Sequence, residues 1–97
     1  MKTLKINLGK SGTMPVDAFC VFNHRGQQWF IHESHDNPGK LTVSHYPSGY
    51  RALRIPRYLV GTYRGEMIKH ARAKLDAIPQ GVFDAAVERL KTEEINP

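Results

Sequence analysis

AFCVFNHRGQQWFIHES, residues 18–34, holds two apolar runs separated by a short polar segment. The runs Ala18–Asn23 and Gln28–Ser34 are rich in aromatic and β-branched side chains, which is typical of β-strands. His24–Gln27 lies between them and suits a hairpin connection, because Gly26 can adopt a positive φ. The stretch therefore predicts two antiparallel strands joined by a tight turn.

The segments on either side continue this pattern of short strands. Lys2–Leu8 alternates apolar with polar residues, as a half-buried strand does. Residues 9–15 are rich in glycine and proline and predict a loop. Leu41–His45 predicts a fourth strand, and Tyr50–Ile55 predicts a fifth that ends at Pro56.

The pattern changes after Gly65. Apolar residues recur at spacings of three and four over residues of about 63–77, which predicts an amphipathic helix. A second helix is predicted over about 82–92, after a break at residues 79–81. The charged tail from Lys91 to Pro97 is expected to fray.

Strands over about 3–55 followed by helices predict an α+β fold, an antiparallel β-meander of four to five strands packed against one or two C-terminal helices. Residues 1–97 are expected to form a single domain, with Trp29 in its core; an exposed tryptophan would instead be an interface anchor. The lone cysteine, Cys20, excludes an internal disulfide and is expected to be a small buried hydrophobe. No apolar run is long enough to cross a membrane and no signal peptide is expected, so the sequence predicts a cytoplasmic protein, in the host cytoplasm if the chain is phage-encoded. A homodimer remains open.

The positive charge of the chain is concentrated in its middle. The net charge is +5 at pH 7, and residues 51–74 hold seven arginines and lysines against Glu66 as the one acid. Residues 75–97 carry two basic residues against five acidic ones. A basic cluster of this kind favours an anionic partner.

Tyrosines are interleaved with these arginines. Arginine side chains grip phosphates or carboxylates, and tyrosine rings can stack on bases. We name the expected partner-binding residues the Arg/Tyr surface, and we expect the acidic second helix to lie away from it. The alternative is a solvated face whose arginines keep an edge strand from aggregating. The Arg/Tyr surface comprises Tyr50, Arg51, Arg54, Arg57, Tyr58, Tyr63, Arg64, Lys69, Arg72 and Lys74.

Motifs for cofactor or metal binding are not found. Gly9-Lys10-Ser11 follows a strand, but a phosphate loop needs a further glycine at the position of Leu4, so these residues predict a turn. His32, His35 and His45 are the best candidate metal ligands, yet their spacing matches no known ligand pattern. We expect no metal and no cofactor.

The sequence does not predict an enzyme. A nucleophile, a base and an orienting acid can be chosen from Ser34, His45 and Asp36, but nothing in their spacing supports the choice. Ser44 precedes His45 on a predicted strand, so the two side chains should point to opposite faces.

The order of elements resembles a known class of small proteins. Trp29–Ile31 on one strand, Val43–His45 on the next and the tight turn Pro47–Gly49 before a last strand and a helix resemble phage- and mobile-element-encoded accessory proteins, among them some anti-CRISPR proteins. The resemblance covers residues 18–78 and is one of architecture. It implies a stoichiometric inhibitor without a catalytic site that docks on a host defence complex and blocks nucleic-acid access or nuclease recruitment.

One property departs from that class. Many such inhibitors are acidic and mimic DNA, whereas this chain is basic. It would have to grip an acidic protein surface or the nucleic acid itself. The leading hypothesis is a non-enzymatic inhibitor or adaptor that binds a host CRISPR–Cas-like complex through the Arg/Tyr surface. The alternative is a small basic module that binds the phosphate backbone of DNA or RNA.

Overall fold

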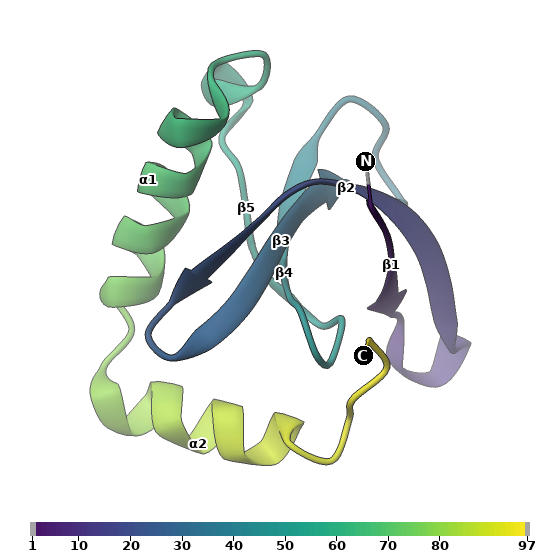
Figure 1. Cartoon of the computed structure of the whole chain (residues 1–97), viewed down its shortest axis with the longest axis vertical. Helices are drawn as coiled ribbons and strands as arrows, with labels where there is room; N and C mark the ends of the chain where they lie inside the picture. The colour runs from purple at the N-terminus through teal and green to yellow at the C-terminus, as the bar shows by residue number, and fades with distance from the viewer. Residues whose placement is uncertain (1, 97) are drawn as a thin grey trace.

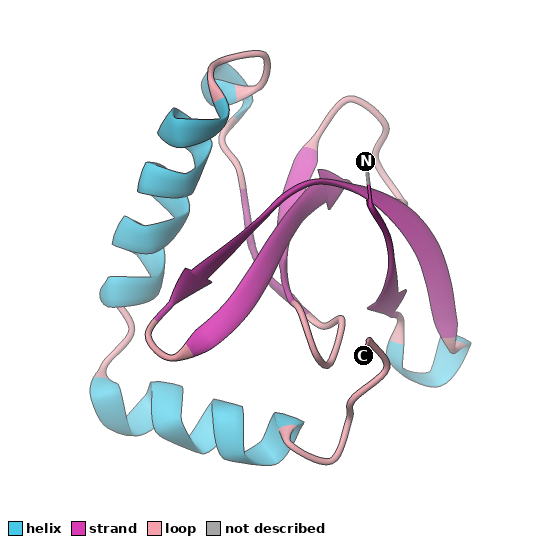
Figure 2. Cartoon of the chain, viewed as in Figure 1, coloured by secondary structure: helices cyan, strands magenta, loops and turns pink. Residues whose placement is uncertain are grey.

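The computed structural model describes residues 2–96 and shows one antiparallel sheet with two helices (Figures 1 and 2). The helices are α1 (Arg64–Asp76) and α2 (Gln80–Leu90), and the sheet order is β1-β2-β3-β4-β5. This confirms the predicted α+β meander. The strands are β1 (Lys2–Asn7), β2 (Thr13–His24), β3 (Gln27–Glu33), β4 (Leu41–His45) and β5 (Arg51–Arg54); single 3₁₀ turns span Gly9–Ser11 (η1) and Arg57–Leu59 (η2).

The central hairpin forms where the sequence predicts it. Phe22 pairs with Trp29, and the two-residue turn of Arg25 and Gly26 has φ of +51° and +75°. Two positive φ values match the right-handed twist of the strands that the turn joins. Trp29 is buried, as predicted.

β2 begins five residues earlier than predicted, because Pro15 lies within it instead of ending a loop. Pro15 pairs with Lys5 of β1. The amide and carbonyl of Lys5 point away from β2 and bind the side chain of Asn96. The Lys5–Pro15 pair is therefore not hydrogen-bonded, and the proline needs no N–H there.

The two faces of the sheet bury different side chains. Trp29 and Ile31 point toward the helices and pack with Leu75 of α1 and Phe83 of α2. Phe30, between them in sequence, points to the other face and packs with apolar side chains of β1. Cys20 is buried on the helix face, as expected.

The sheet curls so that its first strand approaches its last hairpin. A bulge interrupts the β2–β3 register between Ala18 and Cys20, and Figure 1 shows β2 bending over the sheet. The Asn7 amide donates to the carbonyl of Gly49 in the β4–β5 turn, over 2.9 Å. The sheet therefore encloses the apolar cluster around Phe30 on its concave side. The helices cover the convex side.

Arg25 fastens the central hairpin to both helices. Its Nη1 donates to the carbonyl of Leu75 at the end of α1 (2.6 Å) and to that of Ile78 (3.0 Å), and Nη2 donates to Gln80 (2.9 Å). The guanidinium also lies 3.9 Å from the ring centroid of Phe83. A cation at a helix C-terminus satisfies carbonyls that have no partner within the helix.

The C-terminal segment does not fray, so that expectation was wrong for residues 91–96; Pro97 lies outside the described residues. Asn96 is buried, and its Nδ2 donates to the carbonyls of Lys5 (2.9 Å) and Tyr46 (2.7 Å). Its Oδ1 accepts from the Lys5 amide (2.9 Å). One side-chain amide thus covers the outer edge of β1, which polarity along the sequence could not reveal.

The predicted helices are present with shifted ends. α1 lies within the predicted range of about 63–77, whereas α2 begins two residues before the predicted start and ends at Leu90. Pro79 occupies the N-cap and Gly81 lies in the first turn, where neither disrupts a helical hydrogen bond. Neither helix of the described chain has the length and apolar composition needed to cross a bilayer.

Candidate binding surface and pockets

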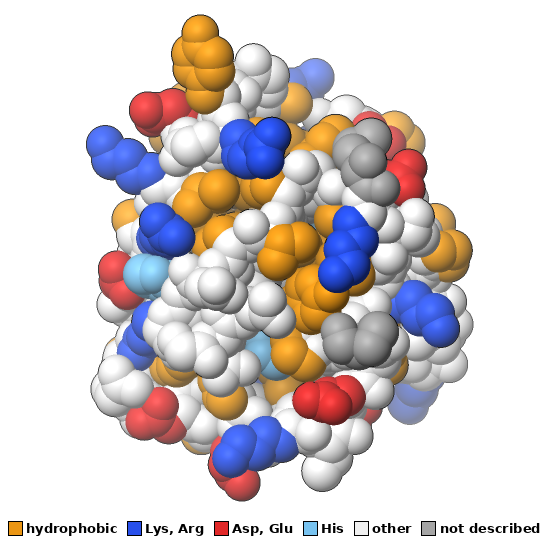
Figure 3. Space-filling model, in the orientation of Figure 1, with side chains coloured by type: hydrophobic (Ala, Val, Ile, Leu, Met, Phe, Trp, Pro, Cys, Tyr) orange, Lys and Arg blue, Asp and Glu red, His pale blue; other side chains and the backbone are white. Residues whose placement is uncertain are grey.

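The Arg/Tyr surface follows the edge of the sheet and continues onto α1. Arg51 and Arg54 lie on β5, which is an edge strand, and η2 contributes Arg57 and Tyr58. Tyr58 and Tyr63 are 76% and 88% exposed. The other predicted members are also exposed except Tyr50, which is half-buried. Figure 3 shows Lys and Arg side chains along the edge of the molecule formed by α1.

The cations of this surface lack acidic partners. Within residues 2–96 the ion pairs are His24–Asp76 and Lys91–Glu88. None of the seven arginines and lysines of residues 51–74 therefore pairs with a described carboxylate. A group of uncompensated cations raises the local potential and attracts anions.

The residues on α1 do not all face the same way. Successive helical residues are rotated by about 100°, so Arg72 and Lys74 project from opposite flanks of α1. Arg72 reaches back to β2, where it donates to the carbonyl of Asn23 over 3.2 Å and lies over the ring of Phe22. Arg72 therefore also fastens the helix to the sheet. Arg51, Arg54, Arg57 and Arg64 lie on β5, on η2 and at the start of α1, which follow one another along the chain.

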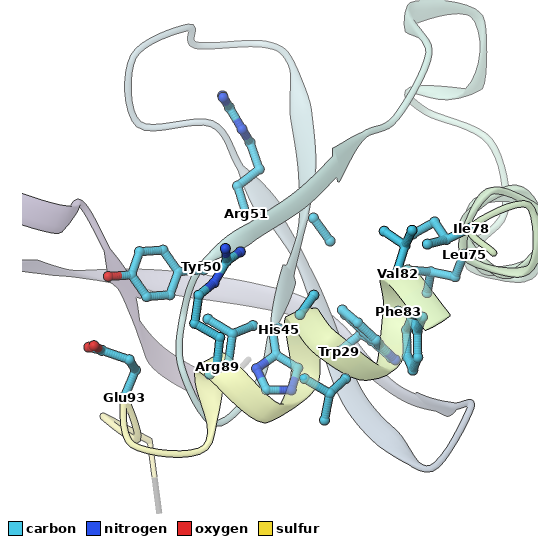
Figure 4. Close-up of a pocket in the computed structure, with 14 residues that line it drawn as sticks. Trp29, His45, Tyr50, Arg51, Leu75, Ile78, Val82, Phe83, Arg89 and Glu93 are labelled. Atoms are coloured by element: carbon cyan, nitrogen blue, oxygen red, sulfur yellow. The ribbon is translucent and has the colours of Figure 1, made fainter. Parts of the chain in front are cut away.

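An apolar pocket lies beside this surface, between α2 and the β4–β5 hairpin (Figure 4). Its volume is about 520 Å³, and Trp29, Leu75 and Phe83 line its buried side. Tyr50 and Arg51 line the other side. The prediction that α2 lies away from the Arg/Tyr surface was therefore wrong, because the short α1–α2 connection folds α2 beneath the sheet.

His45 sits deep in this pocket as a neutral side chain. Its Nδ1 is hydrogen-bonded to Ser48 (2.7 Å), and its Nε2 to Gln27 (2.8 Å). Burial lowers the pKa of His45. The Trp29 ring packs edge-on against the imidazole, with centroids 5.2 Å apart. The histidine therefore holds the β4–β5 turn against the hairpin.

A second, polar pocket of about 540 Å³ lies on the concave side of the sheet. Its buried lining includes His32, Ser34, Thr42 and Ser44. His32 Nδ1 is 2.9 Å from the backbone oxygen of Glu33, which can only accept, so this nitrogen carries the proton.

The tautomer of His32 determines its second hydrogen bond. Burial is the main cause that lowers the pKa of His32, aided by the nearby charge of His35 and opposed by the Glu33 carbonyl. In the neutral ring Nε2 accepts, so the Ser44 hydroxyl donates to it over 2.8 Å. Ser34 and Thr42 form a neighbouring hydroxyl pair.

The structure separates the residues that sequence spacing left open as catalytic or metal-binding groups. Ser44 points into the concave side, whereas His45 points into the apolar pocket, as alternation on a strand predicts. His32 and His45 consequently lie on opposite faces. Within residues 2–96, no group of three or more His, Cys, Asp or Glu side chains is placed to hold a metal ion. The pairing of His32 with Ser44 depends on strand register, which spacing in the sequence did not reveal.

The two buried histidines predict a loss of stability in mild acid. Both have pKa values below the ordinary 6.5, so the folded chain keeps them neutral while the unfolded chain binds protons. The free energy of unfolding should be highest above about pH 6.5 and should decrease as the pH falls below that value. Urea unfolding at several pH values between 7.5 and 5 measures this. A constant free energy of unfolding across that range would contradict the prediction.

Comparison of the chain with protein-family models, with curated proteins and with solved structures finds no match.

Proposed function

We propose that this chain is a non-enzymatic inhibitor or adaptor that binds an acidic surface of a partner protein through the Arg/Tyr surface. The observation that carries the proposal is the set of seven cations between Arg51 and Lys74 with no ion-pair partner among residues 2–96. Unpaired surface charge of one sign contributes little to folding, whereas it steers and orients an oppositely charged partner.

The buried hydroxyl–imidazole pairs fit a structural role in this proposal. Ser44 and His32 are almost wholly buried, and both ring nitrogens of His32 are used within the chain. Such saturated pairs fix strand register and leave no proton acceptor free for a substrate. In this proposal the function rests on surface contacts.

A host defence complex of the CRISPR–Cas type is the partner class we propose to test first. Such complexes bind nucleic acid in channels that proteins line with positive charge. A basic inhibitor that docked on an acidic patch could block nuclease recruitment, or it could cover the entry of nucleic acid.

Charge reversal at the middle of the Arg/Tyr surface tests the proposal. The double variant Arg54→Glu/Arg57→Glu should capture its partner from host lysate at least about tenfold less than the parent chain, because two attractive contacts become repulsive. Quantitative mass spectrometry of the captured proteins is the measurement. The control is Lys5→Glu/Lys10→Glu, which makes the same change in net charge at exposed side chains of β1 and η1. Equal capture by both double variants would refute the assignment.

A nucleic-acid partner is the second candidate, favoured by the exposure of Tyr58 and Tyr63. Each ring follows or precedes an arginine, which is the arrangement that stacks on single-stranded bases while contacting phosphate. Binding of a single-stranded oligonucleotide should then weaken steeply as salt rises. A gel-shift titration measures it, and no shift at low salt would remove this candidate.

A further inference from the structure

The apolar pocket of Figure 4 is left open because α2 covers the sheet incompletely. Phe83 is the one buried side chain of α2, whereas Val82 is 61% exposed. In Figure 4, Phe83 lies beside Trp29 on the helix side of the pocket, and Val82 also lines the pocket. Ala86 and Val87 continue the same wall along the next turn of α2. The pocket therefore presents apolar surface at a volume of about 520 Å³, within the range of ordinary ligand sites.

Arg89 is the cation at the mouth of this pocket. In Figure 4 it leans from α2 toward Tyr50, whereas Arg51, which also borders the pocket, extends from β5 away from it. Neither arginine forms an ion pair within residues 2–96, although Glu93 also borders the mouth. Arg51 and Tyr50 belong to the Arg/Tyr surface as well, so the pocket and that surface are continuous.

We propose that this pocket receives a large apolar side chain, aromatic or the size of leucine, from an acidic segment of the partner protein. The side chain packs against Trp29 and Phe83, and Arg89 binds a carboxylate that flanks it in the partner's sequence. This inference rests on the proposed function and names what the partner must carry. An apolar anchor in a pocket, ringed by polar contacts, is how most protein interfaces concentrate their binding energy.

The pocket fits a protein segment better than the other occupants. The walls on α2 are apolar and present no further cation for a phosphate backbone beyond Arg89. A second copy of this chain would bring another net charge of +5 against the Arg/Tyr surface, which repels it. An acidic segment with an apolar side chain complements Arg89 and the adjoining Arg/Tyr surface in charge, and its apolar side chain complements the lining.

The experiment uses the single tryptophan of the chain as its reporter. In a ¹⁵N-labelled sample the Trp29 indole N–H, which donates to the carbonyl of His24, gives one resolved signal. The probes are three unlabelled acetylated peptides: a central tryptophan between two runs of three aspartates, the same peptide with serine at the centre, and a central tryptophan between two runs of three lysines.

The acidic tryptophan peptide should shift the Trp29 indole signal and the amides of Val82–Leu90. Its dissociation constant should be at least about tenfold lower than that of either other peptide, since burying an aromatic side chain is worth more than 1.4 kcal/mol. The variant Ala86→Glu places a carboxylate in the pocket and should abolish these shifts. Ala85→Glu is the matched control, because Ala85 is exposed on α2 and does not line the pocket.

Each other outcome overturns one proposal. Equal binding of the tryptophan and serine peptides, lost in Arg54→Glu/Arg57→Glu, refutes the pocket and leaves the Arg/Tyr surface supported. Equal effects of Ala86→Glu and Ala85→Glu also refute the pocket, as does the absence of any shift at millimolar peptide. Shifts that depend on protein concentration without peptide identify a second copy as the occupant. Loss of partner capture in Ala86→Glu but not in Arg54→Glu/Arg57→Glu refutes the proposed function and leaves the pocket supported.

Discussion

Gly49→Ala should destabilise the fold by about 4 kcal/mol, close to 20 °C in melting temperature for a domain of this size. Gly49 has a φ of +73°, and a Cβ there would lie 2.7 Å from the carbonyl oxygen of Lys5 and 2.9 Å from the amide nitrogen of Asn7. These are backbone atoms of β1, which cannot rotate away. The β4–β5 turn would have to withdraw from β1 and break the hydrogen bond between Asn7 and Gly49.

Gly39→Ala is the control for this prediction. Gly39 has a similar φ of +86°, yet a Cβ there would meet nothing within 4 Å. The free energy of unfolding of that variant should decrease by only about 1 kcal/mol, which is the cost of holding an alanine in the left-handed conformation. Thermal and urea unfolding of both variants measure the difference. Similar losses for Gly39→Ala and Gly49→Ala would show that the close approach to β1 is not a constraint.

Asn96→Asp should cost about 3 kcal/mol at neutral pH, although it exchanges one atom for another of similar size. The amide of Asn96 donates to the carbonyls of Lys5 and Tyr46, and a carboxylate cannot donate to either. Two carbonyl oxygens would instead face a buried negative charge. Protonation restores one donor, so the loss relative to the parent chain should shrink toward pH 4.

Asn7→Asp separates this effect from the general cost of an added acid. Asn7 Oδ1 accepts from the Gly9 amide over 2.8 Å, a role that a carboxylate performs equally well. Its free energy of unfolding should change by less than about 0.5 kcal/mol, as is usual for surface changes. Urea unfolding at pH 7 and pH 4 measures both variants. An equal loss for Asn7→Asp and Asn96→Asp would refute the role assigned to the Asn96 amide.

Local sequence patterns predicted the strands and helices well. Alternation around Trp29 and the positive φ at Gly26 define the central hairpin, and apolar spacing of three and four defines α1. These signals depend on neighbours in sequence, which is why they succeed. The start of β2 was missed because a proline normally indicates a loop. Pro15 fits within the strand only because its pairing with Lys5 is not hydrogen-bonded, which the sequence does not show.

The features that depend on distant residues could not be predicted in this way. The charge of the Arg/Tyr surface is visible in the sequence, but the opposite directions of Arg72 and Lys74 follow from helical phase, and the contact of Arg72 with Asn23 follows from packing. The apolar pocket joins Trp29 to Phe83 through the connection between α1 and α2. The pairing of Ser44 with His32 follows from the β3–β4 register.

The contact between Asn96 and Lys5 also bears on the kinetics of folding. It joins residues 91 positions apart. Forming it early would close a long loop, and the loss of chain entropy would not yet be offset by the contacts of the sheet. Interactions that form after the transition state leave the folding rate almost unchanged and slow unfolding. The hydrogen bonds between Asn96 and Lys5 at the edge of β1 should therefore mainly slow unfolding. They lengthen the lifetime of the native chain more than they speed its folding.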